Sequence, residues 1–237
     1  ITGIGAIYHT VNPRLFPEQI AWIVNHAQDR VMMLDLTFVP LMEAVQDKTP
    51  SIERFVILTD KAHMPATKLR NAVAYEDWIA EVDGNFKWAE FDENTAAGLC
   101  YTSGTTGDPK GVELSHGSLT LCARSGVDSF DLDETMHVVA ILPWAHVFGL
   151  AADLHDYVHC GGGIAFAESV EKLIQNFQEV KPTGLSVVPR IVNKVYDTIQ
   201  QGVAADPTKK MFFDAAVAEA IKNRDLPEKT KEFKDYD

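Results

Sequence analysis

Short apolar runs of strand length alternate along the chain with segments that repeat apolar residues at helical spacing. The apolar runs predict strands at residues 5–11, 30–35, 54–60, 97–103, 136–143, 161–167 and 182–189. The periodic segments predict helices at residues 16–28, 38–47, 75–82, 116–130, 169–180, 190–202 and about 207–224. Apolar strands that alternate with helices are typical of parallel sheets covered on both faces. The pattern therefore predicts the α/β class, with largely parallel sheets flanked by helices.

Single residues mark the ends of three predicted helices. Pro17 suits a first helical turn, where its missing N–H group is tolerated. Ser115 stands just before a helix, where its hydroxyl can cap free N–H groups. Gly202 is expected to close the helix that precedes it.

Composition and charge narrow the classes of function. The 237 residues include 34 acidic and 21 basic side chains, a net charge of −13. This charge argues against a nucleic-acid partner and against general affinity for anionic membranes. No apolar run reaches the ~18–20 residues of a membrane span, so no encoded anchor is expected.

The cysteines and the start of the chain bear on location and length. Cys100, Cys122 and Cys160 form no C-x-x-C pair, which indicates a reducing compartment and a cytoplasmic protein. The chain opens at Ile1 in the middle of a pattern, without an initiator methionine, so it is expected to be a fragment of something longer.

One stretch, YTSGTTGDPKG at residues 101–111, concentrates polar chemistry directly after a predicted strand. Its hydroxyls, and three glycines that permit positive φ angles and leave space for a ligand beside the backbone, suit a loop whose N–H groups face an anion. Lys110 adds a point charge of the kind that binds phosphate. The stretch predicts a polyphosphate-binding loop, with a flexible Gly/Thr connector as the alternative. The stretch does not match the common P-loop, in which a glycine precedes the lysine and a serine or threonine follows it. Here Pro109 precedes Lys110 and Gly111 follows Lys110.

Two motifs in the sequence resemble those of a known family. LCYTSGTTGDPKG at 99–111 resembles the AMP-binding signature of the adenylate-forming superfamily, and LPWAHVFGL at 142–150 resembles its Pro-x-x-His-x-x-Gly segment. Residues 181–199 and 209–216 look like long-chain acyl-CoA synthetases, whereas residues 5–35 are closer to bacterial medium-chain ligases. The two parts of the chain thus resemble different branches, and the character changes just after Gly111.

The resemblance implies a fold, a reaction and a site. Residues 1–237 are expected to be an incomplete adenylation domain within the large N-terminal domain, without the C-terminal domain that carries a catalytic lysine. The implied reaction is ATP-dependent activation of a fatty acid to acyl-AMP and then acyl-CoA, with Mg²⁺ as cofactor and coenzyme A as co-substrate. His146 is expected near the acyl-adenylate, and the residues expected to bind the ATP phosphates are Thr102, Ser103, Gly104, Thr105, Thr106, Gly107 and Lys110.

Other parts of the family pattern have no counterpart in the sequence. The adenine and magnesium motif, the ribose-binding aspartate and the hinge are missing, so the segment alone is not expected to complete either half-reaction. The resemblance also leaves room for peripheral membrane association of the longer protein.

Several alternatives remain open. Another adenylating enzyme, such as an aryl-CoA ligase or a peptide-synthetase domain, would share these motifs, as would a non-catalytic nucleotide-binding module. His155 and His159 stand at i, i+4 beside Cys160, a spacing that can ligate zinc, but no further ligand set accompanies them and no metal ligand is predicted. Ser115 and His116 lack the G-x-S-x-G elbow of a hydrolase.

Overall fold

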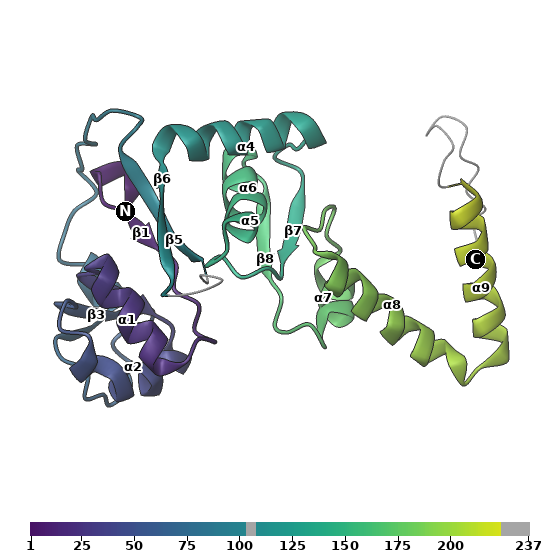
Figure 1. Cartoon of the computed structure of the whole chain (residues 1–237), viewed down its shortest axis with the longest axis horizontal. Helices are drawn as coiled ribbons and strands as arrows, with labels where there is room; N and C mark the ends of the chain where they lie inside the picture. Colours follow the sequence, from purple (N-terminus) through teal and green to yellow (C-terminus); the bar gives the residue numbers. More distant parts are fainter. Residues whose placement is uncertain (103–107, 224–237) are drawn as a thin grey trace. The chain divides into compact units, whose positions relative to one another are not determined.

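The computed structural model describes residues 1–102 and 108–223, and these form two compact units (Figure 1). Unit 1 comprises residues 1–166 with 182–186, and unit 2 comprises residues 167–181 with the described part of 187–237. Helices and largely parallel strands alternate within unit 1, which confirms the predicted α/β class.

The first part of unit 1 is a parallel three-stranded sheet with the order β2-β3-β4. Its strands are β2 (Val31–Leu34), β3 (Arg54–Ile57) and β4 (Ala72–Ala74). Helices α1 (Pro17–Ala27) and α2 (Val39–Val45) lie beside this sheet, and α3 (Tyr75–Ile79) follows β4 (Figure 1). The core between them contains Ile20, Met42 and the fully buried Phe55.

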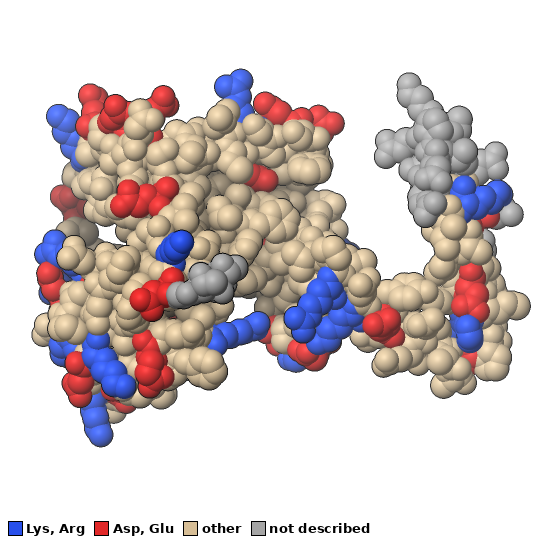
Figure 2. Space-filling model, in the orientation of Figure 1, with Lys and Arg blue, Asp and Glu red and all other residues tan. Residues whose placement is uncertain are grey.

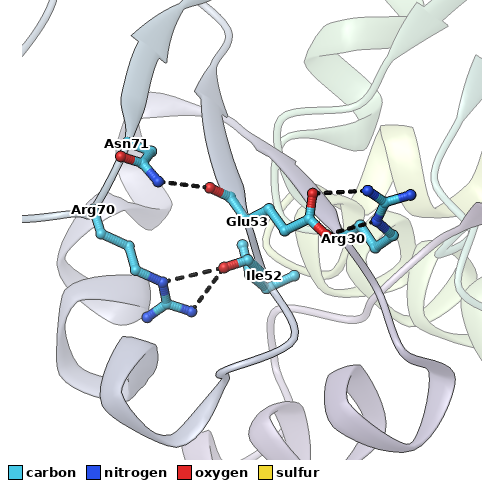
Figure 3. Close-up of polar contacts among 5 residues, drawn as sticks. All are labelled: Arg30, Ile52, Glu53, Arg70 and Asn71. Carbon is cyan, nitrogen blue, oxygen red and sulfur yellow. Dashed lines mark hydrogen bonds and ion pairs between the residues drawn. The ribbon is translucent and has the colours of Figure 1, made fainter.

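Arg70 lies just before β4 and links the connections of this sheet; Figure 3 shows its two hydrogen bonds to the Ile52 carbonyl. Its guanidinium donates to three backbone carbonyls: those of Gln46 (2.6 Å), Thr49 and Ile52 (3.0 and 3.1 Å). Its charge also lies 5.6 Å from the centre of the Phe55 ring. A second arginine in the same view, Arg30, forms a bidentate pair with Glu53 on the surface. Such exposed pairs contribute little, so Arg70 is the stabilising contact of the two.

The second sheet has the order β1-β5-β6 and holds the predicted phosphate loop between its last two strands. β1 (Tyr8–His9) runs parallel to β5 (Ala96–Thr102), whereas β6 (Lys110–Ser115) runs antiparallel to β5. β6 lies outside the sequence prediction because its residues are mostly exposed and the strand has no continuous apolar run.

Helix α4 (His116–Phe130) begins where the sequence places it. The Ser115 hydroxyl accepts a hydrogen bond from the Ser118 N–H group (3.2 Å), which confirms Ser115 as the cap. The His116 ring packs on Phe91 at a centroid distance of 4.7 Å. Pro17 is likewise confirmed in the first turn of α1.

A third, two-stranded parallel sheet completes unit 1. It pairs β7 (His137–Ala140) with β8 (Gly163–Phe166), and between them lie α5 (Val147–Gly149), a π-helical segment (Leu150–His155) and α6 (Asp156–Cys160). Helix α4 packs against α6 and the π-helical segment (Figure 1).

Two sequence predictions in the C-terminal half are wrong. Residues 182–189 form no strand, because the segment meets β7 only at the single bridge Val138↔Gly184, and prolines at both its ends lack N–H donors. Gly202 does not end its helix, since α8 (Pro189–Ala204) continues past it. Unit 2 also contains α7 (Leu173–Val180) and α9 (Pro207–Asn223). In the described part of the chain, every helix is too short or too polar to cross a bilayer.

Candidate functional site

The β5–β6 hairpin brings the two ends of the predicted phosphate loop together. Thr102 at the end of β5 pairs directly with Lys110 at the start of β6, and both residues are exposed. Ser103, Gly104, Thr105, Thr106 and Gly107 lie outside the described residues. Lys110 forms no ion pair with any described residue.

Gly111 has a different role from the one that the sequence predicts. The described glycines with positive φ are Gly5 and Gly161, so Gly111 has the extended backbone that any residue adopts in a strand. It faces Tyr101 across the hairpin, and a Cβ atom at Gly111 would lie 3.2 Å from Tyr101 Cζ. The glycine therefore makes room for the tyrosine ring.

A cavity of about 430 Å³ borders the hairpin. Thr102 and Pro109 line it from the two sides of the loop, and His146 lines it from the segment before α5. Most of the remaining lining residues are apolar, for example Val11 and Leu114. One cavity thus adjoins both motifs singled out in the sequence, which lie 44 residues apart, from Thr102 to His146.

His146 is held in one orientation by the start of α5. Its Nδ1 accepts a hydrogen bond from the Phe148 N–H group (3.2 Å), and the backbone N–H group of His146 donates to the Pro143 carbonyl (3.0 Å). Because Nδ1 accepts, the proton of the neutral ring is on Nε2, which leaves Nε2–H as a donor. The Thr10 hydroxyl donates to the Trp144 carbonyl (2.7 Å) and fastens this turn to the segment after β1.

A cluster of histidines and aromatic rings, which sequence reasoning missed, surrounds Tyr101. The Tyr101 hydroxyl is hydrogen-bonded to His26 Nδ1 (2.6 Å), and His26 stacks on Trp22 at a centroid distance of 4.7 Å. The His9 ring lies 5.1 Å from the Tyr101 ring, and His9 Nδ1 donates to Asp29 (2.7 Å). Burial first, and then the charge of Asp29, raise the pKa of Tyr101. No spacing in the sequence signals this cluster, because the pairing of β1 with β5 assembles it.

His155 and Cys160, which stand at a spacing that can ligate zinc, each form a hydrogen bond within the protein. His155 Nε2 is hydrogen-bonded to the Tyr8 hydroxyl (2.8 Å), and burial lowers the pKa of His155 while raising that of Tyr8 to about 12. Cys160 donates through its sulfur to the Tyr157 carbonyl. Across residues 1–102 and 108–223, no three His, Cys, Asp or Glu side chains are grouped so as to hold a metal ion.

Asp153 is a buried carboxyl group that the sequence does not single out. It lies in the π-helical segment, is 0% exposed, and neither of its oxygens has a hydrogen bond of good geometry with a described residue. Burial first of all, and to a smaller degree the nearby charge of Asp156, raise its pKa to about 6, although the Ser186 hydroxyl and the Leu142 N–H group oppose the rise. The protein therefore carries a carboxyl group whose ionisation is unfavourable in the folded state.

This burial predicts a pH-dependent effect of Asp153→Asn on stability. The folded state keeps the Asp153 proton between about pH 4 and pH 6, where the unfolded chain has lost it, so ionisation destabilises the fold as pH rises through this window. Relative to wild type, Asp153→Asn is expected to gain about 1–2 kcal/mol of unfolding free energy between pH 4.5 and pH 7.5. Urea unfolding of both proteins at the two pH values measures this gain.

Asp133→Asn provides the control for that measurement. Hydrogen bonds from the hydroxyl and N–H group of Thr135 lower the pKa of Asp133, so the stability difference between Asp133→Asn and wild type should change only below about pH 4 and stay constant between pH 4.5 and pH 7.5. A stability difference between Asp153→Asn and wild type that does not change with pH would contradict the raised pKa of Asp153.

Comparison with known proteins relates the hairpin and the cavity to a family. A family model described as AMP-binding enzyme matches residues 1–229. A medium-chain-fatty-acid–CoA ligase of Ectopseudomonas oleovorans is 40% identical over 149 residues, which cover 62% of this chain and 27% of that protein. Long chain acyl-CoA synthetase 7, peroxisomal, of Arabidopsis thaliana is 29% identical over 210 residues, which cover 85% of this chain and 30% of that protein. The chain thus spans less than a third of the length of either relative.

The fold of the chain is also similar to that of a solved CoA ligase structure. The crystal structure of the anthranilate CoA ligase AuaEII in complex with anthranoyl-AMP superposes with a TM-score of 0.69 at 25% identity, over 77% of this chain and 35% of that one. Because the family model matches nearly all of the chain, including the residues of both motifs, the protein belongs to the AMP-binding enzyme family.

Proposed function

We propose that this chain is part of an ATP-dependent ligase that converts a fatty acid to an acyl-adenylate and then to an acyl-CoA thioester. The observation that carries the proposal is the hairpin that pairs Thr102 with Lys110 at the edge of a cavity lined by His146. The names of the two relatives, one a medium-chain ligase and one a long-chain synthetase, support a fatty acid as the substrate.

The loop is the proposed site of the ATP phosphates. In the first half-reaction a carboxylate oxygen attacks the α-phosphorus, and the bond from that phosphorus to the bridging oxygen of pyrophosphate breaks. Negative charge collects on the leaving pyrophosphate, and a fixed cation with hydroxyl and N–H donors lowers the energy of that charge. The residues proposed for this task are Thr102, Ser103, Gly104, Thr105, Thr106, Gly107 and Lys110.

His146 is proposed to orient the acid rather than to act as a base. A carboxylate is already ionised at neutral pH, so its attack requires no proton transfer. The Nε2–H group that the α5 contact leaves available suits a hydrogen bond to a carboxylate oxygen. In the second half-reaction the thiolate of coenzyme A, after loss of the thiol proton, attacks the acyl carbon, and AMP leaves with the electrons of the broken C–O bond.

Mg²⁺ is proposed to reach the site on the ATP phosphates. This ion usually binds substrate phosphates and several waters, with only one or two carboxylates from the protein. The described residues contain no three-ligand group, so no residue is assigned to the ion and no step depends on it.

We also propose that residues 1–237 form an incomplete adenylation domain, and that the domain with the catalytic lysine lies elsewhere in a longer protein. The short share of each relative that the chain covers supports this. The longer protein is also proposed to be cytoplasmic, with peripheral membrane contact and no nucleic-acid partner. Of these points, the absence of a nucleic-acid partner is supported by the net charge of −13 and by the acidic side chains that Figure 2 shows interspersed with basic ones over the visible face of unit 1.

Two other functions remain candidates. An aryl-CoA ligase or a peptide-synthetase adenylation domain would use the same loop, and the similarity to an anthranilate CoA ligase favours the aryl acid among these. A non-catalytic nucleotide-binding module would keep ATP binding without acyl transfer.

Acid-dependent exchange of labelled pyrophosphate into ATP tests the proposal on the full-length protein. The panel contains a medium-chain, a long-chain and an aromatic acid, with a no-acid control. We expect exchange with one or both fatty acids and none without acid. Exchange with the aromatic acid alone would replace the fatty acid by an aryl substrate, and ATP binding without exchange for any acid would support the non-catalytic module.

A further inference from the structure

Tyr101 lies at the point where β5 ends and the phosphate loop begins, and three residues from two elements, α1 and β1, contact its side chain. Its hydroxyl is hydrogen-bonded to His26 of α1 (2.6 Å), and its ring lies 5.1 Å from that of His9 in β1. The Trp22 ring meets it edge-on at 6.4 Å, with an interplanar angle of 89°. Contacts from α1 and β1 therefore hold the Tyr101 side chain in place, although Tyr101 is not among the residues proposed to bind phosphate or the acid.

The fourth contact comes from the other strand of the hairpin. Tyr101 and Gly111 are direct partners in the β5–β6 register, and the ring occupies the space that a side chain at Gly111 would fill. A Cβ atom there would lie 3.2 Å from Cζ of Tyr101 and 3.3 Å from both its hydroxyl oxygen and Leu99 Cδ1. The hydrogen bond to His26 and the space over Gly111 are thus coupled, because the ring cannot move in response to one without affecting the other.

The next pair along the hairpin is Thr102 with Lys110. These two residues are the described ends of the proposed phosphate site, and they follow the Tyr101–Gly111 pair directly on both strands. In a hairpin, the position of one cross-strand pair sets the backbone of the next. A shift of the Tyr101 ring would therefore move Lys110 relative to the phosphates without any loss of charge.

We propose that Tyr101 is a positioning residue for nucleotide binding: its hydrogen bond to His26 and its packing over Gly111 hold the Thr102–Lys110 pair in place. The inference rests on the proposed function, because it assigns Tyr101 to the same phosphate site. It gives a reason for the pairing of a bulky ring at 101 with a glycine at 111. Neither a contact with phosphate nor a positive φ angle at Gly111 accounts for that pairing.

Kinetics of pyrophosphate exchange by the full-length protein test the proposal. Tyr101→Phe removes only the hydroxyl, and Gly111→Ala places a methyl group against the ring. Each is expected to raise the KM for ATP about three- to tenfold, while kcat and the KM for the acid change less than twofold. His26→Ala should raise the KM for ATP similarly, and the double variant with Tyr101→Phe should add little, because both single changes break the same hydrogen bond.

Matched controls separate positioning from general damage to the fold. Tyr196→Phe changes a partly exposed tyrosine of α8, and Gly202→Ala adds a methyl group that meets nothing within 4 Å, so both should leave the KM for ATP unchanged. Thermal unfolding of every variant is measured in parallel. A purely structural role would lower the unfolding temperature and disturb kcat and both KM values together.

Lys110→Ala distinguishes failure of this inference from failure of the proposed function. If Lys110→Ala weakens ATP binding while Tyr101→Phe leaves the KM for ATP within twofold of wild type, the positioning role is wrong and the phosphate site stands. If ATP binding is insensitive to Lys110→Ala, the phosphate site is wrong, and the positioning role is overturned with it.

Discussion

Lys110→Ala is expected to lower kcat/KM for ATP in pyrophosphate exchange by about 10²- to 10³-fold, the typical effect of removing one donor that stabilises the charge developing in the transition state. Lys110 is the only basic residue in the stretch 101–111, and it forms no ion pair with any described residue. Steady-state exchange at varied ATP, with the fatty acid saturating, measures the effect.

Two further variants define what the lysine provides. Lys110→Arg keeps the charge but changes its shape, and it should recover part of the activity. Lys61→Ala removes an exposed lysine from the turn after β3 and should change kcat/KM less than twofold. Equal effects of Lys61→Ala and Lys110→Ala would show that net charge, rather than a phosphate contact, governs activity.

Arg70→Ala is expected to cost about 2–4 kcal/mol of unfolding free energy, the largest stability effect of the contacts discussed. The substitution removes a charged donor from the carbonyls of Gln46, Thr49 and Ile52 and also removes the contact over Phe55. The contributions of these hydrogen bonds are not additive, which keeps the expected total below their sum. Urea unfolding monitored by circular dichroism gives the value.

Arg70→Lys and Arg54→Ala complete that experiment. Lysine keeps the charge but cannot reach three carbonyls with one planar group, so Arg70→Lys should recover less than half of the loss. Arg54 is an exposed residue at the start of β3, and its removal should change stability by less than about 0.5 kcal/mol. A loss in Arg70→Ala no greater than that in Arg54→Ala would contradict the role of Arg70.

Local patterns predicted much of the fold. The α/β class, the start of α4 with its Ser115 cap, and Pro17 in the first turn of α1 follow from residues close together in sequence, and the structure confirms them. β6 was not predicted, because its exposed residues have no apolar run. Residues 182–189 were assigned as a strand, because their apolar composition resembles one although only Gly184 pairs.

The candidate site was likewise predicted only in part from the sequence. The signature and the Pro-x-x-His-x-x-Gly segment were recognisable in the sequence, and the chain's membership of the AMP-binding enzyme family is confirmed. The cavity that brings Thr102 and His146 to one place depends on tertiary structure. Tyr101 and His26 are 75 residues apart, and Gly111 was interpreted from its usual conformational freedom rather than from the ring opposite it. Contacts of this kind require the pairing of strands, which no local pattern specifies.

The most direct test of the proposed function is product analysis for the full-length protein with ATP, a fatty acid and coenzyme A. Adenylation followed by thioester formation predicts acyl-CoA and AMP in equal amounts, with pyrophosphate released and no ADP. Formation of ADP and phosphate, or release of AMP that does not depend on the acid, would contradict the assignment of this chain to an acid-activating ligase.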